Sequence, residues 1–295
     1  MASTGELFPV EHNRQLNRPL TSGATRIPVA RIIAVANQKG GVGKTTTVIN
    51  LASSLAAAER RVLALDSDPQ GNLSSGLGCK AAGRPTLYEA LLEQRPLEEL
   101  IIPTALEHLS LVPSDRNLTG AEVELVPVLA REYRLKEALA PVAGRYDYVF
   151  VDCPPSLGLL TVNALAAADS LLIPLQCEYF ALEGVSELMN TLHRVQRALN
   201  AKLEVEGVLL TMVDERNNLT QQVRDEARNF FKDKLFRTVV PRSVRLAEAP
   251  SFGKPILLYD IRSRGAQAYL DLAKEIMAHE KKGAGQGTLR TPAGS

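Results

Sequence analysis

Short hydrophobic runs recur along the chain, and most are apolar at every position rather than at alternate positions. They predict strands at 31–37, 61–66, 109–113, 147–152, 170–175 and 207–213. Apolar residues at helical spacing predict helices at about 44–58, 85–94, 119–140, 157–168, 180–199, 219–233 and 263–280. Strands that are apolar on both sides are typical of a sheet covered by helices on each face. The alternation predicts an α/β fold, with a doubly wound, mainly parallel sheet flanked by helices.

The two ends of the chain depart from this pattern. Residues 1–29 are polar and interrupted by proline and glycine, which predicts a flexible N-terminal extension. Residues 281–295 are rich in glycine and small side chains, which predicts a disordered C-terminal tail. We find no internal repeat and no boundary between them, so we expect a single domain over 30–280.

Composition narrows the function classes. The 34 basic and 33 acidic residues nearly cancel, so any nucleic-acid contact must come from a local basic patch. No stretch reaches the ~18 apolar residues of a membrane helix, and the N-terminus lacks the apolar core of a signal peptide. The three cysteines lack the spacing of a zinc site. We therefore expect a soluble, cytoplasmic protein.

The strongest chemical signal is the sequence QKGGVGKTT at 38–46, between the first predicted strand and the first predicted helix. In that context a glycine-rich loop is a phosphate site rather than a plain turn. Glycine lets backbone N–H groups approach phosphates, and the helix adds its positive N-terminus. We expect Lys44 against the β- and γ-phosphates and the Thr45 hydroxyl on Mg²⁺. The sequence thus predicts an ATP site made by Gly40, Gly41, Val42, Gly43, Lys44, Thr45 and Thr46.

Acidic residues stand at the ends of two further predicted strands. Asp66 and Asp68 follow the second strand, and Asp152 ends the run YVFVD. Nucleotides bind at the edge of an open α/β sheet where the carboxyl ends of the strands meet. These carboxylates are therefore expected at the sheet edge where a nucleotide binds, although the first pair also suits capping of the next helix.

These motifs carry a resemblance to a known family. KGGVGKTT resembles the deviant Walker A loop of the ParA/MinD superfamily of P-loop NTPases, and the preceding Asn37-Gln38 resembles the chromosomal Soj branch. DSDPQGN at 66–72 and DCPPS at 152–156 are similar to the DxDPQGN and DxPPS elements of ParA proteins. The resemblance covers about 31–280 and implies a P-loop ATPase that uses ATP and Mg²⁺.

The resemblance also implies residue roles. Lys39 would cross a dimer interface to the partner's nucleotide, so Lys39 and Lys44 join Asp68 as catalytic residues. Asp68 would position the attacking water, and Asp66 would support the P-loop and the magnesium shell. Thr45, Asp68 and Asp152 are the expected metal-site residues, with Asp152 acting through a water.

A later block, VPRSVRLAEAP at 240–250, resembles a Soj element in which Pro241 and Arg242 flank the adenine. The alternative for these two residues is a loop with a helix cap that does not contact the adenine. DNA binding is expected from basic residues of the predicted helix at 219–233 and of the segment after Arg242, with Arg224, Arg228, Arg245 and Lys254 as candidates. The alternative for each of them is an exposed side chain that contacts only solvent.

The resemblance implies a partitioning ATPase of the ParA/Soj type. It would dimerise on ATP, bind double-stranded DNA non-specifically in the cytoplasm on the nucleoid, and segregate a chromosome or plasmid. A ParB/Spo0J-like partner would stimulate hydrolysis. The main alternative is a MinD-like membrane-associated ATPase that positions cell division, but the C-terminus lacks an amphipathic basic helix. A small-molecule enzyme on the same scaffold and an ATP-binding scaffold without turnover are the others.

Overall fold

A computed structural model of the chain describes residues 30–286 except 82, 179–180 and 215. The predicted N-terminal extension and residues 287–295 of the predicted tail lie outside the described residues. Within the described part, no helix has the length and apolar character needed to cross a membrane.

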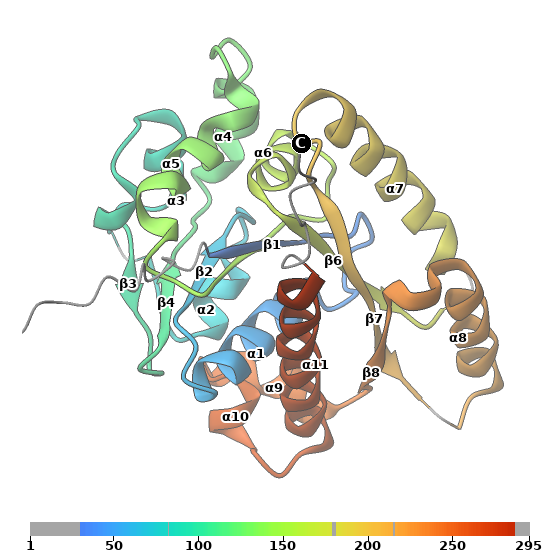
Figure 1. Ribbon diagram of the computed structural model, residues 1–295. Coiled ribbons are helices and arrows are strands. Elements are labelled where there is room, and N and C mark those ends of the chain that lie inside the picture. The colour runs from blue at the N-terminus through green and yellow to red at the C-terminus, as the bar shows by residue number, and fades with distance from the viewer. Residues whose placement is uncertain (1–29, 82, 179–180, 215, 287–295) are drawn as a thin grey trace, which may run out of the picture.

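Eight strands form one sheet in the order β3-β4-β2-β5-β1-β6-β7-β8 (Figure 1). All neighbours pair in parallel except β3 and β4, so the predicted doubly wound, mainly parallel sheet is confirmed. The strands are β1 (Arg31–Val35), β2 (Val62–Asp66), β3 (Ile102–Pro103), β4 (Leu109–Val112), β5 (Tyr148–Asp152), β6 (Ser170–Gln176), β7 (Glu204–Val213) and β8 (Leu235–Pro241).

Helices surround this sheet. The α-helices are α1 (Lys44–Ala57), α2 (Asn72–Gly76), α3 (Leu87–Leu92), α4 (Leu118–Glu124), α5 (Arg134–Ala143), α6 (Leu159–Ala167), α7 (Ala181–Ala198), α8 (Asn218–Phe231), α9 (Val244–Glu248), α10 (Ile256–Tyr259) and α11 (Arg264–Gln286). Short 3₁₀ helices are η1 (Leu97–Glu99), η2 (Arg131–Tyr133), η3 (Lys232–Lys234) and η4 (Ala249–Phe252).

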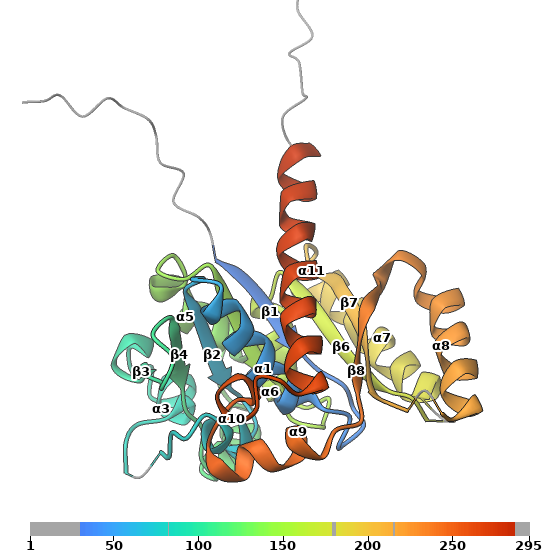
Figure 2. The ribbon, with the colours of Figure 1, turned by 90° about the horizontal axis from the view of Figure 1, so that it is seen from below.

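The apolar strands divide their side chains between two cores, as the period of two in a strand requires. Leu65 and Val151 face the core beneath α3, α5, α6 and α7. Ala64 and Phe150, one residue before each, face the core beneath α1 and α11. In Figures 1 and 2 the sheet runs between these two groups of helices. The central strands are buried at every position, which explains their continuous hydrophobicity.

Several predicted elements need correction. The helix predicted over 119–140 is wrong, because the chain forms α4 and α5 with turns and η2 between them. Pro127 falls in that break, where its ring and missing N–H disfavour a continuous helix. Strand β8 was not predicted: it is an edge strand with Arg237 exposed, so it lacks a continuous apolar run. Helix α11 extends to Gln286, beyond its predicted end and into the predicted tail.

Candidate nucleotide site

The loop between β1 and α1 has the backbone conformation that its glycines permit. Gly41 and Gly43 have φ values of +75° and +91°, in the left-handed region that glycine adopts without strain. Gly43 is the N-cap of α1, so the loop leads straight into the helix N-terminus. The Thr211 hydroxyl of β7 donates to the Val42 carbonyl over 2.8 Å and braces the loop. The loop conformation, at the N-terminus of α1, therefore suits the binding of an anion such as phosphate.

Lys44 is the first residue of α1, and its side chain folds back over the loop. It is only 7% exposed, and its Nζ donates to the Lys39 carbonyl over 3.1 Å. Burial lowers the pKa of Lys44, while Asp152, the Cys153 thiol and Asp68 act in the opposite direction. A buried ammonium with one carbonyl acceptor among the described residues is well placed to contact a polyanion that completes its coordination.

Asp152 ends β5 beside Val35 of β1, at the edge that carries the loop. It is fully buried, and no described residue makes a hydrogen bond of good geometry to either carboxylate oxygen. Its pKa is raised well above the usual range, first by burial and second by the neighbouring Asp66, with the Thr45 hydroxyl offsetting part of the shift. Orphaned buried oxygens are costly. A divalent cation beside Thr45 and Asp152 would satisfy them.

The described residues contain no cluster of three or more His, Cys, Asp or Glu side chains that forms a metal cage. Mg²⁺ does not need one, because it commonly takes one or two protein oxygens together with phosphate oxygens and water. The donor set of one hydroxyl and one carboxylate beside a phosphate cradle therefore fits Mg²⁺.

Asp68 lies in the turn after β2 and is 7% exposed. One carboxylate oxygen accepts from the Gln70 backbone N–H at 2.9 Å, and the Ser114 hydroxyl donates to the Asp68 carbonyl at 2.7 Å. Asp68 also acts electrostatically on Lys44 and Asp152, so it belongs to the same site. The structure thus brings Lys44, Asp68 and Asp152 together.

Asp66 makes its hydrogen bonds within its own loop and lies beside Asp152 in the sheet. Its carboxylate accepts from the Ser74 N–H at 2.8 Å and the Ser74 hydroxyl at 2.7 Å, and from the Asp68 N–H at 3.3 Å. Complete burial raises its pKa to about 6. Its hydrogen bonds hold the turn that presents Asp68 and the start of α2, rather than the P-loop. Sequence alone did not indicate Ser74 as its partner.

Lys39 protrudes from the loop. Its side chain is 42% exposed, and its Nζ pairs with Glu178 of the same chain, in the segment after β6. The Lys39 N–H donates to the Asn37 side chain, whose amide donates to the Pro174 carbonyl. The loop is thus tied to β6, and Lys39 extends from a fixed base.

A pocket of about 370 Å³ opens beside the loop and is lined by Gly43 and Thr46 on one side and by Pro241 and Arg242 on the other. The two segments meet because β8 ends at the edge where α1 begins. Met212 also lines it with a φ of 53°, a left-handed conformation that costs a non-glycine residue about 1 kcal/mol. Strain of that kind is common at ligand sites. The pocket can hold a flat, largely apolar ring system such as a nucleobase.

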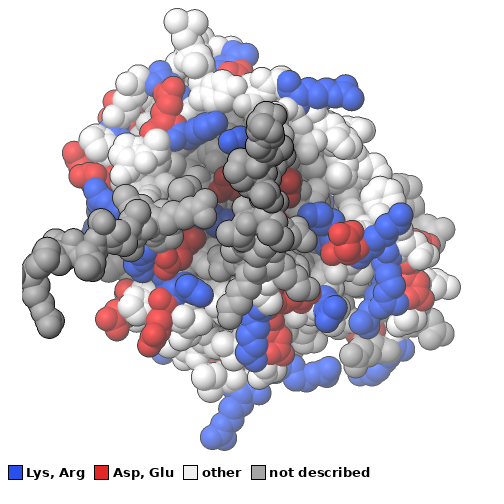
Figure 3. All heavy atoms as spheres, viewed as in Figure 1, with Lys and Arg blue, Asp and Glu red and all other residues white. Residues whose placement is uncertain are grey.

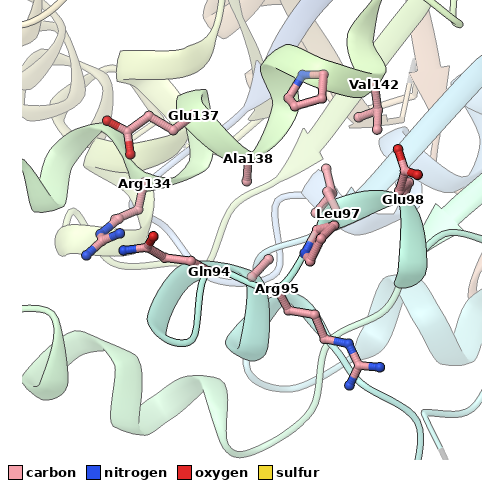
Figure 4. Close-up of a pocket in the computed structure, with 11 residues that line it drawn as sticks. Gln94, Arg95, Leu97, Glu98, Arg134, Glu137, Ala138 and Val142 are labelled. Atoms are coloured by element: carbon pink, nitrogen blue, oxygen red, sulfur yellow. The ribbon is translucent and has the colours of Figure 1, made fainter.

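A second cavity, of about 280 Å³, lies between α3, η1 and α5 (Figure 4). Apolar side chains such as Leu97 and Val142 line it, together with Gln94, Arg134 and Glu137. None of the predicted site residues lines this cavity. It is therefore separate from the nucleotide site.

The candidate DNA-binding residues fall into two groups. Arg224 and Arg228 lie on α8, where they line a cavity of about 530 Å³ with Lys232 and Arg237. Basic side chains gather on the right of Figure 3, where Figure 1 places α8. Arg245 lies on α9 and Lys254 follows η4; α8 and α9 lie apart in both ribbon views (Figures 1 and 2). Arg224 and Arg228 thus lie together on α8, apart from α9 with Arg245.

Comparison with known proteins identifies the family. A family model described as an AAA domain matches residues 30–205. The chromosome partitioning protein ParA of Myxococcus xanthus is 60% identical over 253 residues, covering 85% of this chain and 89% of the relative. The chain belongs to the ParA/Soj family. Sporulation initiation inhibitor protein Soj of Bacillus subtilis is 56% identical over 252 residues, covering 85% of this chain and 100% of the relative.

Solved structures agree with the ParA/Soj fold. A cobyrinic acid a,c-diamide synthase from Mycobacterium smegmatis, solved with bound ADP and magnesium, has a TM-score of 0.76 and 37% identity, covering 86% of this chain and 96% of that one. The cell division ATPase MinD of Pyrococcus furiosus has a TM-score of 0.71 and 26% identity, covering 85% and 99%. The sequence relatives at 56–60% identity are partitioning or Soj proteins, so the resemblance seen in the motifs is confirmed.

Proposed function

We propose that this ParA/Soj protein is an ATP-driven DNA-partitioning switch. It binds ATP and Mg²⁺, pairs with a second copy, binds double-stranded DNA without sequence preference, and releases it after hydrolysis stimulated by a ParB-like partner. This is a cytoplasmic, nucleoid-associated activity that moves a chromosome or plasmid. Relatives are named chromosome partitioning proteins and a chromosome-partitioning ATPase, which supports this role.

Each residue of the nucleotide site has a part in the proposed reaction. The N–H groups of Gly40–Thr46 and the Lys44 ammonium bind the phosphates, while Pro241 and Arg242 enclose the adenine. Thr45 and Asp152 hold the magnesium site, with Asp68 beside them. Mg²⁺, when bound, neutralises charge on the phosphate oxygens. Asp68 orients the attacking water, and Lys39 of the second copy stabilises the charge that develops on the phosphates.

The observation that carries this proposal is the fully buried Asp152, whose oxygens receive no hydrogen bond of good geometry from the described residues, beside a buried Lys44 and a left-handed glycine loop. A buried ammonium group and a buried carboxyl group lie at one sheet edge without a direct hydrogen bond between them. An arrangement of this kind is stabilised by a ligand with its own anionic and cationic groups. A magnesium-bound nucleotide supplies both.

Binding to random-sequence duplex DNA tests the switch. We expect binding with ATP and Mg²⁺, and none with ADP or without nucleotide. Because phosphate contacts dominate non-specific affinity, binding should fall steeply as salt rises. Binding that is equal in all nucleotide states, or absent while ATP is still bound, would refute the switch.

A pair of lysine variants tests the role of the second copy. Lys39→Ala should abolish the ATP-dependent dimer while nucleotide binding largely persists. Lys202→Ala removes an exposed lysine on the loop before β7 and should change neither property. A Lys39→Ala protein that still dimerises with ATP would rule out the trans role.

A further inference from the structure

The segment between β8 and α11 exposes an unusual amount of hydrophobic surface. Phe252 is 62% exposed, Leu258 43% and Ile261 63%. They belong to η4, to α10 and to the turn after α10, on the lower side of the molecule in Figure 1. Tyr259 joins them, because its ring stacks on Phe252 with centroids 5.1 Å apart. We call Phe252, Leu258, Tyr259 and Ile261 the aromatic ridge.

The aromatic ridge is held rigidly. The Tyr259 hydroxyl donates to Glu248 over 3.1 Å, which fixes the ring on which Phe252 stacks. The N–H of Ile256, the first residue of α10, donates to the Asn50 side chain of α1 over 2.7 Å. Gly253, next to Phe252, packs so closely on Gly78 that a Cβ on Gly253 would lie 2.8 Å from the Gly78 Cα. Phe252 is therefore presented by a fixed frame.

The chain segment that carries the aromatic ridge is rich in basic residues. The chain from 242 to 264 contains five basic residues and two acidic ones, a formal charge of +3, and all five basic residues are exposed: Arg242, Arg245, Lys254, Arg262 and Arg264. Both acidic residues have partners: Glu248 accepts from Arg245 over 3.2 Å, and Asp260 lies 3.7 Å from Arg245. The segment that carries the aromatic ridge thus has a net positive charge, which is complementary to a polyanion.

We infer that the aromatic ridge is an apolar contact to double-stranded DNA, with Phe252 at its tip. The exposed basic side chains of the same segment, apart from Arg242 at the nucleotide pocket, bind phosphates, while Phe252 packs against sugars and bases in the groove or inserts at a base step. Phe, Leu and Ile are side chains that DNA-binding proteins use as such wedges. The inference rests on the proposed DNA binding and adds a component that phosphate contacts do not supply. A purely electrostatic surface would not need an exposed, braced phenylalanine.

The two kinds of contact differ in their response to salt. Each lost phosphate contact lowers the slope of log affinity against log salt by about 1. An apolar or stacking contact releases no counterions, so its loss lowers affinity without changing that slope. Removing a side chain that stacks on a base typically costs about fivefold or more in affinity.

The test uses the full chain with ATP, Mg²⁺ and a fluorescent random-sequence duplex, titrated at several salt concentrations. Phe252→Ala should weaken binding at least about fivefold with an unchanged salt slope, whereas Lys254→Ala should reduce the slope by about 1. Leu129→Ala is the control, because Leu129 is 91% exposed in the turns between α4 and α5, away from both the aromatic ridge and α8, and its loss should leave affinity unchanged.

ATP-dependent dimerisation is measured on the same samples. Unchanged affinity in Phe252→Ala, a reduced salt slope in that variant, or loss of its dimer would each overturn the inference. A wild-type protein that binds no DNA with ATP would overturn both the inference and the proposed function. If the wild type binds DNA with ATP and Phe252→Ala binds it equally well, the inference is overturned while the proposed function stands.

Discussion

Lys39 and Glu178 form an ion pair within one subunit, with Nζ and Oε2 2.5 Å apart. Glu178 also accepts a hydrogen bond from the Gln176 amide, which holds the carboxylate near the loop. If Lys39 reaches the nucleotide of a second copy, it must first leave Glu178. The pair therefore competes with dimerisation, and removing the charge of Glu178 should favour the ATP-bound dimer.

The size of this effect follows from the exposure of the pair. The two side chains are 42% and 46% exposed, and pairs of this kind contribute about 0.2–1 kcal/mol each. A symmetric dimer breaks two pairs, so Glu178→Gln should favour it by about 0.4–2 kcal/mol in total. This corresponds to a dimer dissociation constant lower by about 2- to 30-fold. High salt should shrink the difference, because it screens the exposed pair.

Sedimentation equilibrium with Mg²⁺ and a non-hydrolysable ATP analogue measures this constant. Glu187→Gln removes another exposed glutamate, on α7, and is the matched control that should leave the constant unchanged. A Glu178→Gln dimer as weak as the wild type would show that the pair does not compete. A weaker dimer would show that Glu178 contributes to the interface itself, and would refute the argument.

Three further outcomes are expected. Asp68→Ala should lower the rate of ATP hydrolysis by about 100-fold or more while ATP still binds, and unchanged turnover would remove Asp68 from catalysis. Hydrogen bonds from Arg61 lower the pKa of Asp147, so their stabilisation is present above the ordinary value of 3.8 and lost as pH falls through the lowered pKa. Asp147→Asn should therefore cost about 0.5–1 kcal/mol in urea unfolding at pH 7 and little in acid; an equal cost at both would contradict this. Gly253→Ala should destabilise by about 1–3 kcal/mol because its Cβ meets backbone 2.8 Å away, whereas Gly83→Ala, also with positive φ but in open space, should cost less in thermal unfolding; equal costs would assign the effect to φ alone.

Much of the local structure was predictable because it depends on short-range patterns. Central strands such as β2 and β5 are buried on both faces, so they appear in the sequence as unbroken apolar runs. The glycine loop was predictable for a similar reason, because the strand, the loop and the helix N-terminus are contiguous. The sequence prediction missed the break between α4 and α5 although Pro127 marks it. The prediction relied on apolar residues at helical spacing on both sides of the proline.

The amino-acid sequence by itself therefore predicted the sheet class, the glycine loop between β1 and α1, and the placement of Lys44, Asp68 and Asp152 at the carboxyl ends of the strands or in that loop. Only the tertiary structure decided which distant residues complete the site. Thr211 braces Val42 across 169 residues of sequence, and Glu178 pairs with Lys39 across 139. Such contacts arise because parallel strands from distant parts of the chain end at the same sheet edge, and no local pattern of side chains encodes which of them will be neighbours.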